Sequence, residues 1–262
     1  MGTVALEPAS ARSHAELAAL FTAGYEGYFM PVAVDESAFS FMAGTWDYDL
    51  DASLVAVDGD EDVGLCMLGV RGTSSWIGGV GIVAERRGEG IGEQLMRAVE
   101  DRAASRGVEQ LWLEVLAQNE PAIRLYEKLG YRVVRELEVW SLDELVLKEH
   151  DVASVPVADA VGRSPQRPPW QRADAAVKRQ DDARALVGDD GSLVFRSGNG
   201  VASILQAAGD ADAIRSLIES LPAGTTGVRY LNGPVGDPVN GALEALGGTC
   251  VARQHEMLLE LG

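Results

Sequence analysis

The first pattern along the chain is a run of apolar and aromatic residues that recur every three or four positions over the segment 13–28. This spacing places them along one face of an amphipathic helix. Ser13, followed three positions later by Glu16, is typical of a capping box at the start of such a helix. A second short helix is expected around residues 39–42.

Short apolar segments separated by turn signals come next, and they predict strands. The expected strands are 51–57, 62–71 and 76–83, and Gly59 lies in the turn between the first two. Consecutive strands with connections this short are expected to pair as an antiparallel meander.

Helical and extended segments then alternate, which indicates an α/β arrangement. Helices are expected at 92–106 and 121–129, and strands at 111–116 and 131–142. A strand, a helix and a second strand of the same sheet form a right-handed parallel unit. This part of the chain is therefore predicted to be α/β, as an α+β mixed sheet with helices on both faces.

A second, smaller unit is expected after a stretch rich in proline, glycine and arginine. The predicted boundaries are 1–148 for a first domain, 149–182 for a linker and 183–262 for a second domain. Strands are expected in the second domain at 192–196, 201–207, 227–231 and 249–261, and helices at 210–220 and 238–246. This order repeats part of the first domain and favours a partial, degenerate repeat.

The balance of charge argues against some classes of partner. The 262-residue chain has 22 lysines and arginines against 40 aspartates and glutamates, a formal net charge of −18. The resulting field repels phosphate, so neither nucleic acid nor an anionic membrane is expected as a partner. No apolar run approaches the roughly 20 residues of a membrane span, and no signal-peptide pattern begins the chain, which favours a cytoplasmic protein.

Cysteine and histidine usage points to neither a disulfide framework nor a metal. Cys66 and Cys250 allow one pairing at most, and free thiols are the simpler interpretation. His14, His150 and His255 are far apart in sequence and lack the spacing of metal ligands, so no metal is expected.

A glycine-rich segment separates a predicted strand from a predicted helix, and it reads Arg87-Gly88-Glu89-Gly90-Ile91-Gly92. Glycine lets the backbone turn tightly and approach a bound group, and the N–H groups of a helix N-terminus favour anions. The segment therefore predicts a pyrophosphate cradle. It is not a P-loop, because no Gly-Lys-Ser/Thr closes it.

A second motif runs from Asn119 to Tyr131 and reads Asn-Glu-Pro-Ala-Ile-Arg-Leu-Tyr-Glu-Lys-Leu-Gly-Tyr. Together the two motifs resemble the GCN5-related N-acetyltransferase (GNAT) family, whose motifs are Arg/Gln-x-x-Gly-x-Gly/Ala and Asn-x-x-Ala-x-x-Leu-Tyr-x-x-x-Gly-Phe/Tyr. The resemblance covers about residues 4–145. It implies the GNAT acyl-CoA N-acyltransferase fold with acetyl-CoA (coenzyme A) as co-substrate. The second domain carries neither motif, so it would be a smaller, degenerate GNAT-like domain.

The resemblance also implies which residues would bind the cofactor. The backbone of Val80, Gly81 and Ile82 would meet the pantetheine arm, on a strand that bulges and splays from its neighbour. The segment from Arg87 to Gly92 would hold the pyrophosphate. Asn119 would hydrogen-bond the same arm, or cap the helix that follows it, and both can hold at once.

Two side chains would carry the chemistry. Tyr126 would protonate or hydrogen-bond the leaving thiolate, and a core tyrosine is the alternative. Glu114 lies in Leu-Trp-Leu-Glu-Val, which resembles the ribosomal-protein alanine N-acetyltransferases of the family, where the matching glutamate is a general base acting through water. An exposed strand carboxylate is the alternative. The long C-terminal extension is not found in that subgroup, which argues against a peptide N-terminus as acceptor.

The expected reaction is transfer of an acetyl group to an amine of a small molecule or peptide, by direct attack in a ternary complex. Two alternatives stay open: a non-catalytic acyl-CoA-binding regulator, and acyl transfer to a thiol-cofactor precursor as in tandem GNAT enzymes such as the mycothiol synthases. The acceptor pocket would lie around Tyr25, Tyr28, Phe29, Phe41 and Trp46, which a hydrophobic core explains equally well. A homodimer, common in the family, is also open.

Overall fold

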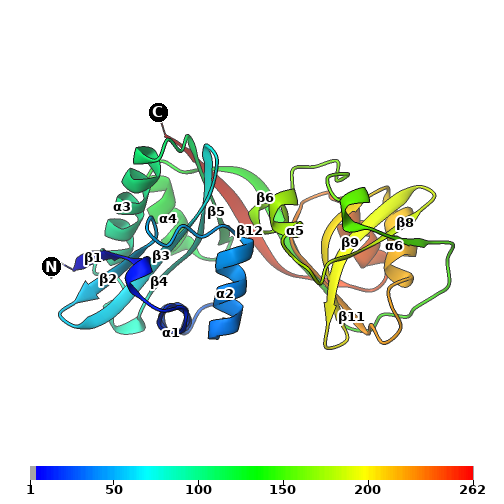
Figure 1. The fold of residues 1–262 in the computed structure, drawn as a ribbon, viewed down its shortest axis with the longest axis horizontal. Coiled ribbons are helices and arrows are strands. Elements are labelled where there is room, and N and C mark those ends of the chain that lie inside the picture. The colour runs from blue at the N-terminus through cyan, green and yellow to red at the C-terminus, as the bar shows by residue number, and fades with distance from the viewer. Residues whose placement is uncertain (1–3, 262) are drawn as a thin grey trace. The chain divides into compact units, whose positions relative to one another are not determined.

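A computed structural model describes residues 4–261 of the protein. Contacts divide the chain into two compact units (Figure 1). Unit 1 comprises Met1–Glu114, Glu120–Arg132 and Met257–Gly262, and unit 2 comprises Val115–Asn119 and Val133–Glu256. Each unit is built from several segments that alternate along the sequence. The expected boundaries, which divide the chain into consecutive pieces, therefore stay a prediction.

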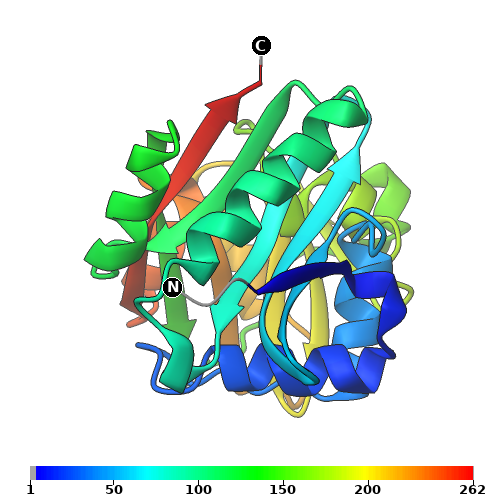
Figure 2. The ribbon, with the colours of Figure 1, turned by 90° about the vertical axis from the view of Figure 1, so that its left-hand side faces the viewer.

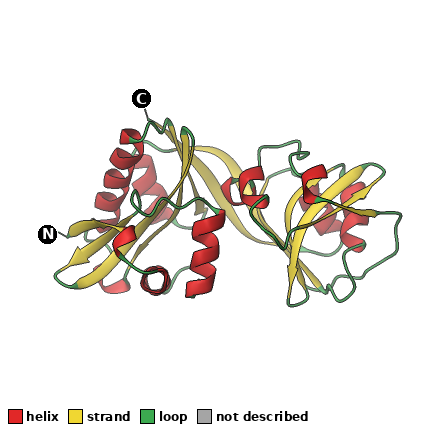
Figure 3. Ribbon diagram, viewed as in Figure 1, coloured by secondary structure: helices red, strands yellow, loops and turns green. Residues whose placement is uncertain are grey.

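Unit 1 contains most of the strands and helices that the first part of the sequence predicts (Figure 3). They are β1 (Ala5–Pro8), η1 (Ala9–Ala11), α1 (His14–Gly24), α2 (Glu36–Thr45), β2 (Leu54–Asp58), β3 (Glu61–Arg71), β4 (Ser74–Ile82), η2 (Ala84–Arg86), α3 (Ile91–Ser105), β5 (Gln110–Leu116) and α4 (Glu120–Lys128). The predicted capping box is present, since Ser13 and Glu16 bond each other's backbone N–H at the start of α1.

The elements of unit 2 begin after α4. They are β6 (Arg132–Leu142), β7 (Ala153–Val155), η3 (Val157–Asp159), η4 (Trp170–Arg172), α5 (Asp174–Val177), β8 (Arg184–Gly188), β9 (Gly191–Gly198), β10 (Val201–Ala208), α6 (Ala211–Glu219), β11 (Gly227–Pro234), α7 (Pro238–Ala245) and β12 (Thr249–Glu260). Both cysteines are free, as expected.

The sheet of unit 1 has the order β1-β2-β3-β4-β5-β12, where β12 contributes its C-terminal end. The strands β2, β3 and β4 pair antiparallel, as the meander predicts, and β4 pairs parallel with β5. Figure 1 shows α3 and α4 on one side of this sheet and α1 and α2 on the other. The mixed sheet with helices on both faces is therefore confirmed.

Two strands belong to a different unit from the one that the sequence predicts for them, over most of β6 and over the end of β12. β6 follows α4 in sequence, yet from Val133 onward it belongs to unit 2, where it pairs antiparallel with β11. The chain ends with β12, whose residues from Met257 onward belong to unit 1; just beyond this strand, the Leu261 N–H donates to the Glu109 carbonyl at 2.9 Å. In Figure 2 this end of β12, drawn in red, runs beside the strands of unit 1.

The segment 149–182 is packed rather than a loose linker. It contains β7, two 3-10 turns and α5, and it buries Trp170, Arg172 and Val177. Val177 joins a small apolar cluster with Ala185 on β8 and Val194 on β9. Proline and glycine composition signals local turns, but it does not report the tertiary contacts that hold such a segment in place.

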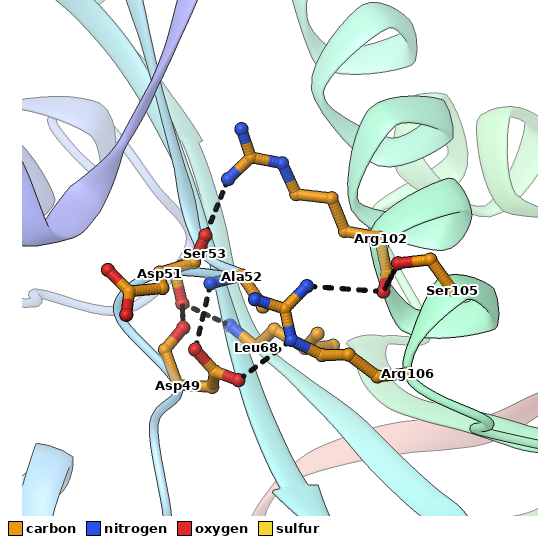
Figure 4. A network of polar contacts seen from close by, with 8 residues as sticks. All are labelled: Asp49, Asp51, Ala52, Ser53, Leu68, Arg102, Ser105 and Arg106. Atoms are coloured by element: carbon orange, nitrogen blue, oxygen red, sulfur yellow. Dashed lines mark hydrogen bonds and ion pairs between the residues drawn. The ribbon is translucent and has the colours of Figure 1, made fainter.

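The C-terminal end of α3 is anchored to the chain that leads into β2 (Figure 4). Arg102 Nη1 donates to the Asp51 carbonyl at 2.5 Å, and Arg106 Nε donates to Asp49 Oδ2 at 3.1 Å. Asp49 Oδ1 in turn accepts from the Ala52 N–H at 2.8 Å. These contacts fix one end of α3 and thereby position its other end, where the glycine-rich loop enters.

One carboxyl group of α3 sits in an unfavourable environment. Glu100 Oε1 is buried and has no hydrogen-bond partner among residues 4–261. Burial raises the pKa of Glu100 from 4.5 to about 7. The folded protein therefore holds a proton that the unfolded chain releases, and the stability this gives is fully present below pH 4.5 and lost as pH rises through about 7.

We expect Glu100→Gln to flatten this part of the pH dependence, because the amide keeps the shape and cannot ionise. Urea unfolding at pH 5 and pH 8 measures the effect. The variant should gain stability over the wild type at pH 8 and differ little at pH 5. An equal difference at both pH values would contradict a raised pKa at Glu100.

Candidate active site

The centre of unit 1 is a place where two neighbouring parallel strands part. β4 pairs with β5 only from Ser74 to Ile77, although β4 itself continues to Ile82. On its other side the register with β3 shifts at the same point, so that Gly78 is an extra, bulged residue. Val80, Gly81 and Ile82 therefore have no strand partner on the β5 side, which leaves a slot in the pairing where the family resemblance would place the cofactor.

Glycines allow other backbone and aromatic groups to approach this parted strand. A Cβ atom on Gly79 would lie 2.7 Å from the Phe21 ring, and one on Gly24 of α1 would lie 2.8 Å from the Gly81 Cα. Side chains at these positions would collide, because real Cβ atoms do not approach other atoms so closely. Close approach between α1 and β4 therefore depends on the absence of side chains.

The loop from Arg87 to Gly92 delivers an open helix N-terminus beside the parted strand. Gly88 and Gly90 have φ angles of 81° and 85°, a left-handed conformation that favours glycine. Gly90 is the N-cap of α3 and supplies no side-chain hydrogen bond. The helices α1, α2, α6 and α7 are each capped by a serine or aspartate side chain. The N–H groups at the start of α3 can therefore serve an anion.

Hydrogen bonds from two arginine side chains hold this loop in place. Arg87 Nε donates to the Ile82 carbonyl at 3.0 Å, and its Nη2 donates to the Glu26 carbonyl at 2.7 Å. Arg86 bonds Glu89 Oε2 at 3.0 Å and Asp58 Oδ2 at 2.6 Å. The side chains of Arg87 and Glu89 are engaged in these bonds within the protein. The backbone N–H groups of the loop are therefore the donors that can serve a ligand.

The helix α4 brings the second motif to the same place. Lys128 Nζ on α4 bonds Glu93 Oε2 on α3 at 2.6 Å, and a Cβ on Gly92 would lie 3.7 Å from Leu125. Asn119 directly precedes α4, and its N–H donates to the Leu116 carbonyl at 2.8 Å. Gly92 therefore lies beside Leu125 of α4, with room for a Cβ atom between them.

Tyr126 on α4 is half-buried, and its ring lies 6.0 Å from that of Tyr131. Burial raises the pKa of Tyr126 well above its usual range, and the nearby Tyr25 adds to the shift. The phenol is therefore protonated at any ordinary pH, which is the state that an acid or a hydrogen-bond donor needs.

Glu114 on β5 has a partner that sequence reasoning missed. The Trp76 indole N–H donates to Glu114 Oε2 at 2.6 Å. Trp76 stacks on Tyr48, with ring centroids 6.1 Å apart and planes 14° apart, and the Tyr48 hydroxyl donates to the Gly78 carbonyl at 3.2 Å. The alternation of Trp76 with Gly78 along β4 was a signal in the sequence, but the contact with Glu114 depends on the parallel pairing of β4 with β5.

Comparison with known proteins agrees with this geometry. Residues 15–131 match the model of the acetyltransferase (GNAT) family. Thialysine N-epsilon-acetyltransferase from Sus scrofa is 30% identical over 131 residues, which are 45% of this chain and 76% of that protein. The chain belongs to the GNAT acetyltransferase family. The family resemblance drawn from the two sequence motifs is confirmed.

Other relatives match this GNAT protein over shorter stretches. Mycothiol acetyltransferase from Corynebacterium aurimucosum is 37% identical over 62 residues, 24% of this chain and 20% of that protein. N-alpha-acetyltransferase 30 from Schizosaccharomyces pombe is 39% identical over 84 residues, 30% of this chain and 56% of that protein. The chain thus covers less than two thirds of the length of both.

Solved structures match the GNAT protein over nearly its whole length and show its fold. A GCN5-related N-acetyltransferase from Sphaerobacter thermophilus has a TM-score of 0.71 at 17% identity, covering 98% of this chain and 95% of that one. A tandem GNAT protein from the clavulanic acid biosynthesis pathway has a TM-score of 0.68 at 15% identity, covering 99% of each chain. The predicted fold class is confirmed.

Two negative findings limit other kinds of site within residues 4–261. These residues contain no group of three or more histidine, cysteine, aspartate or glutamate side chains placed to hold a metal ion. None of the helices described is long and apolar enough to cross a membrane.

We expect Gly90→Val to weaken acetyl-CoA binding by roughly 100-fold, because losing hydrogen bonds to a charged group costs about 3 kcal/mol. The substitution strains the left-handed N-cap of α3 and fills the space before its N–H groups. Isothermal titration calorimetry gives the dissociation constant.

Gly107→Val is the matched control for this experiment. Gly107 follows the other end of α3 and has a similar φ of 76°, with open space around it. Both variants therefore carry the same kind of backbone strain. Equal loss of binding in the two variants would contradict the assignment of the loop.

Proposed function

We propose that this chain transfers an acetyl group from acetyl-CoA to an amine of a small molecule or a peptide, by direct attack in a ternary complex. The observation that carries the proposal is the parting of β4 from β5 directly before the uncapped start of α3. Unpaired strand backbone suits the amide groups of a pantetheine arm, and a bare helix N-terminus suits a pyrophosphate. Acetyl-CoA would supply the activated thioester.

The backbone of this chain would position and polarise the reacting groups. Beyond Ile77, β4 has no strand partner on its β5 side, so the backbone N–H groups on that side could donate to carbonyl oxygens, in place of the hydrogen bond that the Val80 backbone makes with the Tyr25 phenol. The N–H groups that start at Ile91 would hold the pyrophosphate, and Asn119 would bond the arm between them. Holding both reactants in this way makes the attack effectively unimolecular.

Two side chains would move the protons. Glu114 would take a proton from the acceptor ammonium through water, because an amine must lose its proton before it attacks. Tyr126 would donate to the departing thiolate sulfur. Its raised pKa keeps the phenol protonated at the pH where an amine is reactive, so Tyr126 can act as a hydrogen-bond donor to the thiolate sulfur.

The charge of the chain supports an amine as the acceptor. The formal net charge of −18 attracts cationic acceptors, and a carboxylate beside the slot favours an ammonium group. Acyl transfer to a thiol-cofactor precursor is the second candidate. It is supported by the 62-residue match to mycothiol acetyltransferase and by the fold likeness to a tandem GNAT protein.

The first test is release of free thiol from acetyl-CoA against a panel of amines, amino acids, aminoglycosides and peptides. We expect release that depends on one class of amine and is lost in Glu114→Gln. Tight acetyl-CoA binding without release on any acceptor would instead favour the regulatory alternative.

Tyr126→Phe should lower kcat by roughly 100-fold, the usual scale for losing a positioned acid, with little change in acetyl-CoA affinity. Steady-state kinetics and calorimetry separate the two effects. Tyr230→Phe is the matched control, since Tyr230 of unit 2 is also a buried tyrosine with a raised pKa. Unchanged turnover in Tyr126→Phe would remove the role assigned to Tyr126.

A further inference from the structure

Trp76 joins the parted strand to the candidate base. Its indole N–H to Glu114 Oε2 distance of 2.6 Å is short for a bond from nitrogen, as expected when the acceptor is a carboxylate. The Trp76 side chain is held in place, because only 3% of the residue is exposed and its ring stacks on Tyr48. Trp46 packs against the same ring edge to face, with centroids 5.7 Å apart.

The same aromatic cluster also contacts the bulge that opens the slot. A Cβ on Gly78 would collide with both Tyr48 and Trp76, so these rings lie directly over the bulged residue. Glu114 otherwise has several rotatable bonds, and a fixed donor selects one carboxylate orientation. The rigid cluster therefore sets the position of the carboxylate relative to the slot.

We propose that Trp76 is a positioning residue that orients Glu114 for proton transfer. This inference rests on the function proposed above, in which Glu114 is the base. The indole donor stabilises the ionised carboxylate and so keeps it in the form that accepts a proton. Trp76 itself touches neither reactant in this account.

The test is the pH profile of kcat/KM for Trp76→Phe, which keeps an aromatic ring and removes the donor. We expect kcat/KM to fall about tenfold at pH 7 and the acid limb of the profile to move up by about one pH unit. The affinity for acetyl-CoA should not change. A merely structural role would lower activity without moving the acid limb.

Trp140→Phe provides the matched control, because the Trp140 indole also donates to a carboxylate, Glu138 Oε2 at 3.0 Å, within unit 2. The acid limb of the kcat/KM profile of Trp140→Phe should coincide with that of the wild type. An unmoved limb in Trp76→Phe overturns the positioning role. Wild-type protein that transfers no acetyl group to any acceptor sinks the proposed function instead.

A separate observation concerns unit 2, which repeats the parted strands. β10 pairs parallel with β11 only over Val201–Ile204, opposite Gly227–Tyr230, and then continues to Ala208 paired with β9 but not with β11. Its register with β9 shifts between Ile204 and Gln206, so Leu205 is bulged. β4 and β5 part after the same number of pairs, and the bulge follows at the same position.

The gap between these strands holds the side chain of Arg172. Arg172 Nη1 donates to the carbonyl of the bulged Leu205 at 3.1 Å, and Nη2 donates to the Asn232 carbonyl on β11 at 2.8 Å. The guanidinium lies 4.2 Å above the centre of the Tyr230 ring, and Arg172 is only 5% exposed. Gln206 Nε2 donates back to the Arg172 carbonyl at 2.9 Å, which fixes the inserted segment.

The helix that follows β10 is closed as well. The Asp210 side chain accepts from the Ala213 N–H and caps α6, whereas the corresponding helix in unit 1 begins without a side-chain cap. A carboxylate at this position also repels an anion. We infer that Arg172 closes the slot of unit 2, so that each chain binds a single acyl-CoA, in unit 1.

Calorimetry with acetyl-CoA tests this stoichiometry. We expect one site per chain in the wild type, and in Gly90→Val one site that is roughly 100-fold weaker. A second site in the wild type, or a site of wild-type affinity in Gly90→Val, would overturn the closure of unit 2. A wild type that binds no acetyl-CoA would count against the proposed function.

Arg172→Met tests the role of the side chain itself, because it leaves two buried carbonyl groups without their donor. The thermal midpoint should fall by roughly 3 to 10 °C, and acetyl-CoA affinity should stay that of the wild type. Arg163→Met, a change of an exposed arginine in the same segment, should melt as the wild type does. An unshifted thermal midpoint in Arg172→Met would contradict the proposal that the Arg172 side chain closes the slot of unit 2.

Discussion

The loss of pairing between β4 and β5 after Ile77 is the constraint on which the rest of the site depends. A buried strand ordinarily satisfies its backbone groups in the sheet, so leaving the β5-facing backbone groups of β4 without a strand partner is costly unless another group bonds them. The bulge at Gly78 turns the strand away, and aromatic rings pack over it. The slot, the glycine-rich loop and the candidate base, Glu114, all lie next to this one departure from a regular sheet.

In the second unit the same geometry is closed by a side chain of the protein itself. Its strands part in the same way, and the chain fills the gap with a guanidinium that donates to the exposed carbonyl groups of Leu205 and Asn232. The need for hydrogen-bond partners is thus met internally in unit 2 and would be met by a cofactor in unit 1. One fold therefore has an open and a closed version in a single chain.

Local patterns predicted most of the helices and strands, because periodicity and glycine stops act within one element. They also located the glycine-rich loop before α3, and α4 itself. The features that local patterns missed depend on long-range contacts. Apolar and polar residues alternate similarly in β6 and β12, and nothing in either segment says which unit the strand joins. The composition of 149–182 suggested a linker, whereas Trp170 and Val177 are buried, and Val177 packs with residues of β8 and β9. The hydrogen bond from Trp76 to Glu114 could likewise not be predicted from the sequence, because it depends on the register between β4 and β5.

Hydrogen–deuterium exchange with and without acetyl-CoA tests most directly the claim that the parted strand and the loop after it bind the cofactor. We expect acetyl-CoA to slow exchange of backbone amides in the segments 79–82 and 90–93. Exchange over 205–211 of unit 2 should not change. Unchanged exchange in unit 1 at saturating acetyl-CoA, or protection confined to unit 2, would contradict the account.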